Sequence, residues 1–263
     1  MSMRSRHLRP GLRPALALGL VVAAALTLAL GAGLRPARGD VLDEGKLVIS
    51  QQGRQVRLED FKLDRHGDTL IVISASYRVG PDGPAPVADK TLMMLMGALD
   101  YALGYYSSAQ VIGPDTLRRG IVIEGGDTVL TAYRERNQSG RGDRVAMPPG
   151  RLFILDPPLF TMFDLLAHNL RGKEFDRRPV NVFVLGDADS MLTVTVADVG
   201  HEVIRWGGRA VTARKLTISD ENTAFVMWVA PDGRMLRLQQ AQHDILVERK
   251  TPPLKRPAPA RKP

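Results

Sequence analysis

The sequence predicts a mainly β protein of the α+β class. A curved antiparallel meander or half-barrel would carry one or two apolar helices on its concave face. Three observations lead to this prediction. Runs rich in Val, Ile and Thr alternate with turn residues about every 8–12 positions in the second half of the chain. Two segments place apolar residues at helical spacing instead. Cysteine is absent, so packing must hold the domain without disulfides.

Paired strands with short turns make up the predicted meander. The clearest turns lie at 125–127, 186–190, 207–208 and 231–233, each between two runs of strand-forming residues. Glycine and aspartate at such positions favour tight connections between neighbouring antiparallel strands. Earlier in the chain, the run at 69–77 follows another short turn and is also expected to be a strand.

The first helical segment is expected over 91–106. Its apolar residues recur at steps of three and four positions, which is the spacing of one helix face. These residues are Leu92, Leu95, Met96, Leu99 and Leu103. Gly97 and Gly104 lie within the segment, and each costs a helix about 1 kcal/mol relative to alanine.

The second helical segment is expected over 157–170. Asp156 is the predicted N-cap, two prolines occupy the first helical positions, and Gly172 follows the last turn. Its apolar stripe consists of Leu159, Met162, Phe163, Leu166 and Leu170, widened by Phe160 and Leu165. A helix this apolar must be buried, most naturally against the concave face of a sheet.

Residues 1–39 have the order of a secretory signal peptide. Arginines come first, the apolar run 15–32 follows, and Ala37 and Gly39 provide small residues before a cleavage point. We therefore expect an exported, periplasmic protein with a single β-rich domain over 40–249. The alternative is an uncleaved leader that anchors the chain in the inner membrane through 15–32, a run near the lower length limit for a membrane span.

The positive charge of the chain is concentrated at its ends. The net charge is +8, but residues 1–39 hold six arginines and no acid. The segment 250–263 adds five basic residues, which leaves 25 basic and 28 acidic groups between them. Nucleic-acid binding is therefore not expected of the body. The basic, Pro-rich segment 250–263 is expected to be extended and disordered. Weak contact with anionic surfaces is one candidate role, and the alternative is a solvated tail with no role.

The C-terminal hairpins carry a resemblance to known proteins. A glycine turn and strand at 206–216, a Pro-Asp-Gly hairpin at 225–238 and a closing strand at 244–249 follow one another. This order resembles the end of exported bacterial proteins of unknown function, similar in kind to the lipoprotein-sorting (LolA/LolB-like) half-barrels. The match covers about the last 75 residues. It implies a curved antiparallel sheet around a helical plug and an apolar cavity, and it brings no catalytic residues.

An apolar cavity also follows from the residues themselves, since a curved sheet covered by apolar helices tends to leave space for a ligand. Methionine suits such a lining because its thioether adapts to irregular space. The candidate lining residues are Met93, Met96, Leu99, Leu159, Met162, Phe163 and Leu166. The alternative is that these side chains form an ordinary filled core.

Signals for catalysis, cofactors and metals are weak. No nucleophile elbow, phosphate loop or paired zinc-helix histidine motif is present. His66, His168, His201 and His243 show no metal-ligand spacing, and each is expected to be structural or at the surface. No catalytic residue, cofactor or metal ligand is therefore predicted.

Three functions remain open at this point. The first is a non-catalytic envelope protein that binds or carries an apolar ligand, such as a lipid, an acyl chain or a lipoprotein anchor. The second is an assembly module that binds an envelope protein through an exposed strand edge or through its basic tail and has no ligand cavity. The third is a hydrolase, which would need His168 or His201 to meet a carboxylate and a serine in a cleft.

Overall fold

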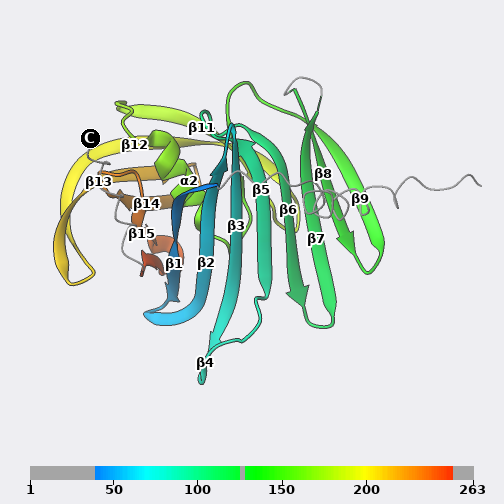
Figure 1. Ribbon diagram of the computed structural model, residues 1–263, viewed down its shortest axis with the longest axis horizontal. Coiled ribbons are helices and arrows are strands. Elements are labelled where there is room, and N and C mark those ends of the chain that lie inside the picture. Colours follow the sequence, from blue (N-terminus) through cyan, green and yellow to red (C-terminus); the bar gives the residue numbers. More distant parts are fainter. Residues whose placement is uncertain (1–38, 125–127, 251–263) are drawn as a thin grey trace, which may run out of the picture. The chain divides into compact units, whose positions relative to one another are not determined.

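A computed structural model describes residues 39–124 and 128–250. Within this part of the chain, the strands form a single 16-stranded sheet with one α-helix, α2 (Thr161–Leu170), and a short 3-10 helix, η1 (Ala241–His243) (Figure 1). The mainly β fold predicted from the sequence is confirmed. The leader 1–38 and the segment 251–263 lie outside the described residues. None of the described helices has the length and hydropathy that a membrane crossing requires.

The strands come in two series along the chain. The first series is β1 (Asp40–Gln51), β2 (Arg54–His66), β3 (Thr69–Gly80), β4 (Gly83–Pro84), β5 (Lys90–Gly97), β6 (Leu103–Ile112), β7 (Asp115–Glu124), β8 (Val129–Arg136) and β9 (Ser139–Ala146). The second is β10 (Leu152–Leu155), β11 (Arg177–Val184), β12 (Ser190–Trp206), β13 (Arg209–Ser219), β14 (Ala224–Val229), β15 (Met235–Gln240) and β16 (Ile245–Arg249).

The path of the chain through the sheet starts in the middle. The strand order is β10-β11-β12-β13-β14-β15-β16-β1-β2-β3-β5-β6-β7-β8-β9, with β4 paired to β3. The first series therefore runs from the centre to one edge, and the second returns from the other edge until β16 pairs with β1. Neighbouring strands are antiparallel except β10 and β11. The edge strands β9 and β10 do not pair, so the sheet stays open.

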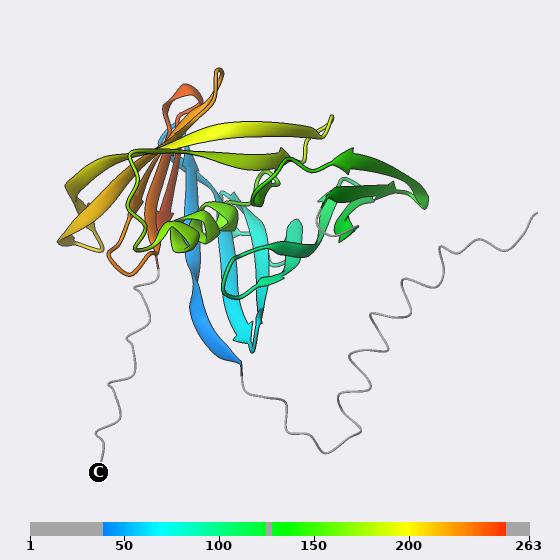
Figure 2. The same ribbon diagram turned by 90° about the horizontal axis from the view of Figure 1, so that it is seen from above.

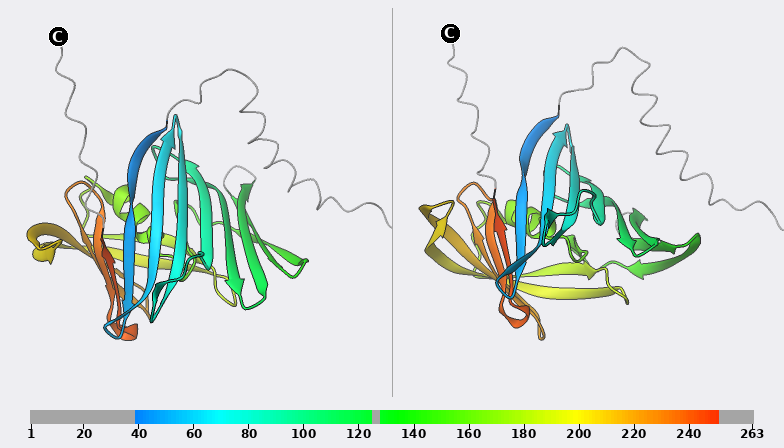
Figure 3. Two further views of the ribbon diagram at one scale, coloured as in Figure 1. Left: turned by 60° about the horizontal axis from the view of Figure 1, so that its bottom comes forward. Right: turned by 90° about the horizontal axis from the view of Figure 1, so that it is seen from below.

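The sheet curves so that one face is concave, and α2 lies against that face (Figures 2 and 3). Register shifts in four strand pairs mark bulges, which bend the strands and increase their twist. Inward side chains of most strands join α2 in a single apolar core. Nine of the ten residues of α2 are buried, as expected for a helix with such a wide apolar stripe.

The prediction of a helix over 91–106 is wrong. This segment is the hairpin of β5 and β6, in which Leu92, Met94 and Met96 face the core and the residues between them do not. A run of Leu and Met fits the face of a strand as well as a helix, and the apolar content alone does not distinguish the two periods. One helix, not two, therefore covers the concave face in the described part of the chain.

The second predicted helix exists but begins later than expected. It starts at Thr161, and Asp156 caps no helix because its carboxylate binds Lys90, Tyr106 and Ser108. The buried ammonium of Lys90 needs a counter-ion, and this need outweighs a cap. Gly172 follows the helix with a φ of 65°, as predicted for a residue that ends a helix.

Candidate functional site, an apolar pocket beside helix α2

An open pocket of about 310 Å³ lies between α2 and the second series of strands. This volume is at the lower end of the roughly 300–1,000 Å³ typical of small-molecule sites. The side chains that line it are Phe153, Ile154, Leu155, Pro157, Leu159, Phe160, Met162, Phe163, Leu166, Val180, Val182, Val184, Leu192, Val194, Ile218, Ser219, Asp220, Thr223, Phe225, Gln240 and Ile245. The pocket can thus hold one slender apolar molecule.

Polar lining residues are few and come from one region of the sequence and sheet. Ser219, Asp220 and Thr223 belong to the end of β13 and the turn before β14, and Gln240 ends β15. No basic residue lines the pocket. The lining therefore offers a long apolar surface, a small group of hydrogen-bonding side chains and one acid.

Three phenylalanines form part of the pocket wall. The rings of Phe163 on α2 and Phe225 on β14 lie 4.9 Å apart between centroids, and Phe160 stacks on Phe163 at 6.2 Å. Contacts of this kind fix ring orientation and add to the energy of burial. The rings connect the helix to the sheet and give the pocket a stiff aromatic wall.

Four of the seven candidate cavity residues line the pocket. These are Leu159, Met162, Phe163 and Leu166. The other three do not, because their segment forms strands rather than a helix. Met96 is buried in the core, Met93 takes the alternate position on β5, and Leu99 is 78% exposed in the turn after β5. Sequence reasoning missed the walls from β10 to β16, which reach α2 only through the curvature of the sheet.

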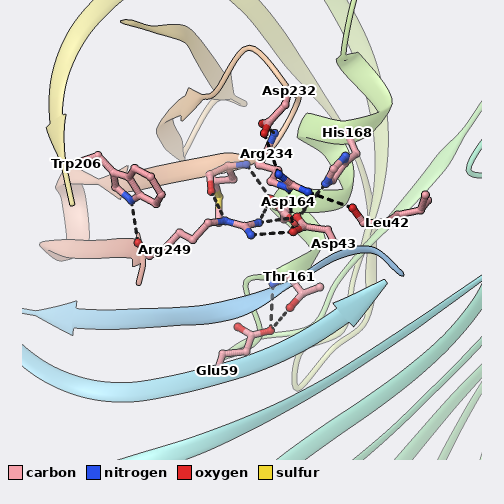
Figure 4. Close-up of polar contacts among 11 residues, drawn as sticks. Leu42, Asp43, Glu59, Thr161, Asp164, His168, Trp206, Asp232, Arg234 and Arg249 are labelled. Atoms are coloured by element: carbon pink, nitrogen blue, oxygen red, sulfur yellow. Dashed lines mark hydrogen bonds and ion pairs between the residues drawn. The ribbon is translucent and has the colours of Figure 1, made fainter. Parts of the chain in front are cut away.

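A buried carboxylate holds the N-terminal end of α2. Glu59 on β2 accepts hydrogen bonds from the backbone N–H of Phe160 at 2.6 Å and of Thr161 at 3.1 Å. Figure 4 shows Glu59 beside Thr161. Glu59 also accepts hydrogen bonds from the hydroxyls of Thr161 and Ser74. These bonds satisfy N–H groups that a helix cannot pair internally, and a carboxylate suits the positive end of the helix dipole. Burial nevertheless raises the pKa of Glu59.

A second buried cluster holds the middle and the C-terminal half of α2. Arg249 on β16 donates to Asp43 on β1 at 2.8 and 3.0 Å and to Asp164 on α2 at 2.7 Å (Figure 4). Asp164 also accepts the backbone N–H of Met235 at 2.8 Å, and His168 lies 3.0 Å from Asp43. One arginine thus connects the helix to two neighbouring strands.

The carboxyls of this cluster have opposite pKa shifts. Burial alone would raise the pKa of Asp43, but the hydrogen bond with His168 and the charge and hydrogen bonds of Arg249 lower it well below its usual range. For Asp164, burial dominates over the attraction of Arg249 and raises the pKa. Asp43 is therefore the firmly ionised partner of Arg249.

The same cluster contains a potential set of metal ligands. Oxygens of Asp43 and Asp164 and a ring nitrogen of His168 lie within 4.8 Å of one another. The guanidinium groups of Arg249 and Arg234 already lie 2.7–3.0 Å from these carboxylates. A divalent cation there would meet two fixed positive charges, so the donor set fits an arginine anchor better than a metal.

A third buried cluster fixes the segment that leads into α2. Lys90 donates to Asp156 and to the carbonyl oxygen of Pro157, each at 2.6 Å. The hydroxyls of Tyr106 and Ser108 donate to the other oxygen of Asp156. Since Pro157 lines the pocket, these bonds position part of its wall.

Sequence reasoning overlooked these buried charges, although the strand alternation marks them. Glu59 shares its strand face with Phe61 and Leu63, and Arg249 shares its face with Val247. A charged residue in step with inward apolar residues must find a buried partner. The partner itself could not be predicted, since Asp43 and Arg249 are 206 positions apart.

Among the described residues, no histidine is hydrogen-bonded to a serine. His168 meets Asp43 and Asp164 inside the core. His201 lines a separate depression whose described lining contains neither serine nor carboxylate. His66 and His243 are exposed.

Comparisons with known proteins find similarity among solved structures. No family model and no curated protein sequence matches this chain. Among solved structures, the chain is similar to a β-barrel-like protein of the domain of unknown function DUF1849 from Brucella abortus. The TM-score is 0.48 and the sequence identity 11%, over 80% of this chain and 95% of that chain. The expected link to lipoprotein sorting remains a prediction.

Proposed function

We propose that this protein is a non-catalytic binding or carrier protein for a single apolar chain, such as a lipid acyl chain or a lipoprotein anchor. The observation that carries the proposal is the open pocket beside α2, with its almost wholly apolar lining. With the signal-peptide pattern of residues 1–39, the proposed place of action is the cell envelope.

The anchoring of α2 supports a pocket that exists before the ligand arrives. Buried bonds hold the helix at Glu59 and at Arg249, so binding need not order this wall. A preformed site avoids the entropy cost of arranging its walls and leaves more of the contact energy for affinity. We therefore propose α2 as a fixed wall of the pocket and not as a cover that moves when the ligand binds.

The pocket favours a carrier over an assembly module without a cavity. Of the two edge strands, β9 bears the exposed charged residues Arg141, Asp143 and Arg144. Charged side chains on an edge strand oppose the addition of another strand. The apolar surface available for recognition in the described chain is thus better explained by a ligand than by strand pairing.

Binding of a neutral fluorescent probe, N-phenyl-1-naphthylamine, tests the proposal. The test variant Leu192→Trp places a bulky ring at a pocket-lining position of β12. The matched control Val203→Trp adds the same ring to the same strand at a position that does not line the pocket and is 66% exposed.

The proposal expects the wild type and Val203→Trp to bind one probe per chain with similar affinity. Leu192→Trp should bind it at least about 10-fold more weakly, a loss of about 1.4 kcal/mol. Equal binding by all three proteins, or no binding by the wild type, would contradict the proposed site. Urea midpoints of the three proteins check that each is folded.

A further inference from the structure

The pocket contains a largely buried polar side chain that has no hydrogen-bond partner in the described part of the chain. Gln240 is the last residue of β15 and is 7% exposed. It shares the concave face with Leu238 and lines the pocket. Within residues 39–124 and 128–250, no hydrogen bond to its side-chain amide is formed. The amide atoms are not among the fully buried unpaired atoms of this part of the chain, so they stay open to the pocket.

A side-chain amide specifies the chemistry of its complement. It offers N–H donors and a carbonyl acceptor side by side, so its best partner offers an acceptor and a donor in one group. A ligand that fills the pocket removes this amide from water, and a polar group that loses water without gaining a partner is costly. An apolar chain alone would leave this amide unpaired.

The charge of the lining residues further restricts which ligand head groups can bind. Asp220 lines the pocket, and its Oδ1 accepts the backbone N–H groups of Asn222 and Thr223 at 2.8 and 2.7 Å. No lysine, arginine or histidine lines the pocket to balance an anion. An anionic head group would therefore meet a carboxylate and no counter-charge, which disfavours it.

We propose that the pocket selects an acyl chain whose head is an uncharged group able to donate and accept hydrogen bonds, as an amide does, over the same chain with an anionic head. This inference rests on the proposed function and adds the class of head group. Gln240 recognises the group, and Asp220 excludes the anion.

Three C12 compounds separate these features by displacement of N-phenyl-1-naphthylamine at pH 8. Dodecanamide donates and accepts, methyl dodecanoate only accepts, and dodecanoate is an anion. The wild type is expected to bind dodecanamide about 3- to 10-fold more tightly than the ester, as one hydrogen bond provides. Dodecanoate should bind most weakly of the three.

Two variants assign the selectivity to its residues. Gln240→Leu keeps the approximate shape and should abolish the preference for the amide over the ester. Asp220→Asn keeps an oxygen for the turn and should strengthen dodecanoate binding about 3- to 10-fold, with dodecanamide unchanged. The second variant lies at the edge of the pocket, so it remains informative if Gln240→Leu folds poorly.

The outcomes distinguish this inference from the function on which it rests. If no C12 compound displaces the probe, the apolar-chain function itself fails. If all three bind equally in the wild type and in both variants, the function stands and the head-group inference is overturned. Tightest binding of dodecanoate by the wild type would also overturn it.

Discussion

Buried charged residues, each with a partner, hold the wall of the pocket in place. Asp43 and Arg249 are fully buried and joined by two hydrogen bonds. Taking charges out of water is costly, and only excellent geometry repays the cost. The complete ion pair therefore adds little net stability to the fold. Its main effect is to fix one arrangement of α2 against the sheet.

Arg249→Met is predicted to destabilise the protein strongly. It leaves Asp43 and Asp164 without their shared cation, and loss of one partner from a buried ion pair costs about 3–5 kcal/mol. Urea denaturation measures the change. The control Arg141→Met removes an exposed pair with Asp143 and should cost less than about 1 kcal/mol. Similar small losses for both variants would contradict the role given to Arg249.

The pH dependence of stability is predicted to include a contribution from Asp43. Its pKa in the folded protein lies below the ordinary value of 3.8, so its stabilisation is present above that pH and is lost as the pH falls through the folded pKa. The stability difference between wild type and Asp43→Asn should therefore shrink from about pH 5 downwards.

Urea denaturation of both proteins between pH 2 and pH 7 measures this difference. The exposed Asp68→Asn serves as the control and should follow the wild type at every pH. Curves for Asp43→Asn and wild type that stay parallel over the acidic range would show that Asp43 does not titrate as described.

Among the elements, α2 is the one that makes a pocket out of a curved sheet. Its stripe Leu159, Met162, Phe163 and Leu166, read from the sequence, became one wall of the pocket. The residue at which α2 begins could not be predicted from the sequence in the same way. The carboxylate that binds its first N–H groups comes from Glu59, about a hundred positions earlier, and no local pattern connects the two.

Two substitutions of Glu59 distinguish the contribution of its hydrogen bonds to stability from the contribution of its charge at the start of α2. Glu59→Ala leaves two helix N–H groups and two hydroxyls without an acceptor and should cost about 2–4 kcal/mol. Glu59→Gln keeps one acceptor oxygen and should cost about half as much or less. Urea denaturation compares them, and equal losses would contradict a capping role.

The misread segment 91–106 shows where single-sequence reasoning fails. Leu92, Met94 and Met96 alternate as a strand requires, yet Leu95 and Leu99 also fit a helical stripe. The pairing of β5 with β3 and β6 decides between the periods, and that pairing is a property of the sheet. The hairpins with Asp-Gly or Gly-Gly turns were predictable because turn chemistry is local.

Across the described body, the two series of strands have different tasks. The first series supplies Asp43, Glu59 and Lys90, which hold α2 and the segment before it. Every residue that lines the pocket comes from 153–245, after the first series ends. The curved sheet was predictable from its strands and turns. The order of the strands was not, because β1 pairs with β16, which lies about two hundred residues later in the sequence.

A bound apolar chain is predicted to stabilise the whole protein. A ligand that binds only the folded state adds about 2.7 kcal/mol when its free concentration is 100 times the dissociation constant. Dodecanamide should therefore raise the urea midpoint of the wild type and of Val203→Trp, and it should raise that of Leu192→Trp clearly less, since about 10-fold weaker binding removes about 1.4 kcal/mol of this stabilisation. An equal rise in all three proteins would indicate binding outside the pocket.

Native mass spectrometry of the purified protein, before and after solvent extraction, tests the central claim most directly. We expect one lipid-sized adduct per chain that solvent removes, or uptake of one dodecanamide by a protein isolated bare. Leu192→Trp should show less of either species than the wild type at the same ligand concentration. A bare wild-type protein that takes up no dodecanamide would contradict the claim that the pocket beside α2 holds an apolar chain.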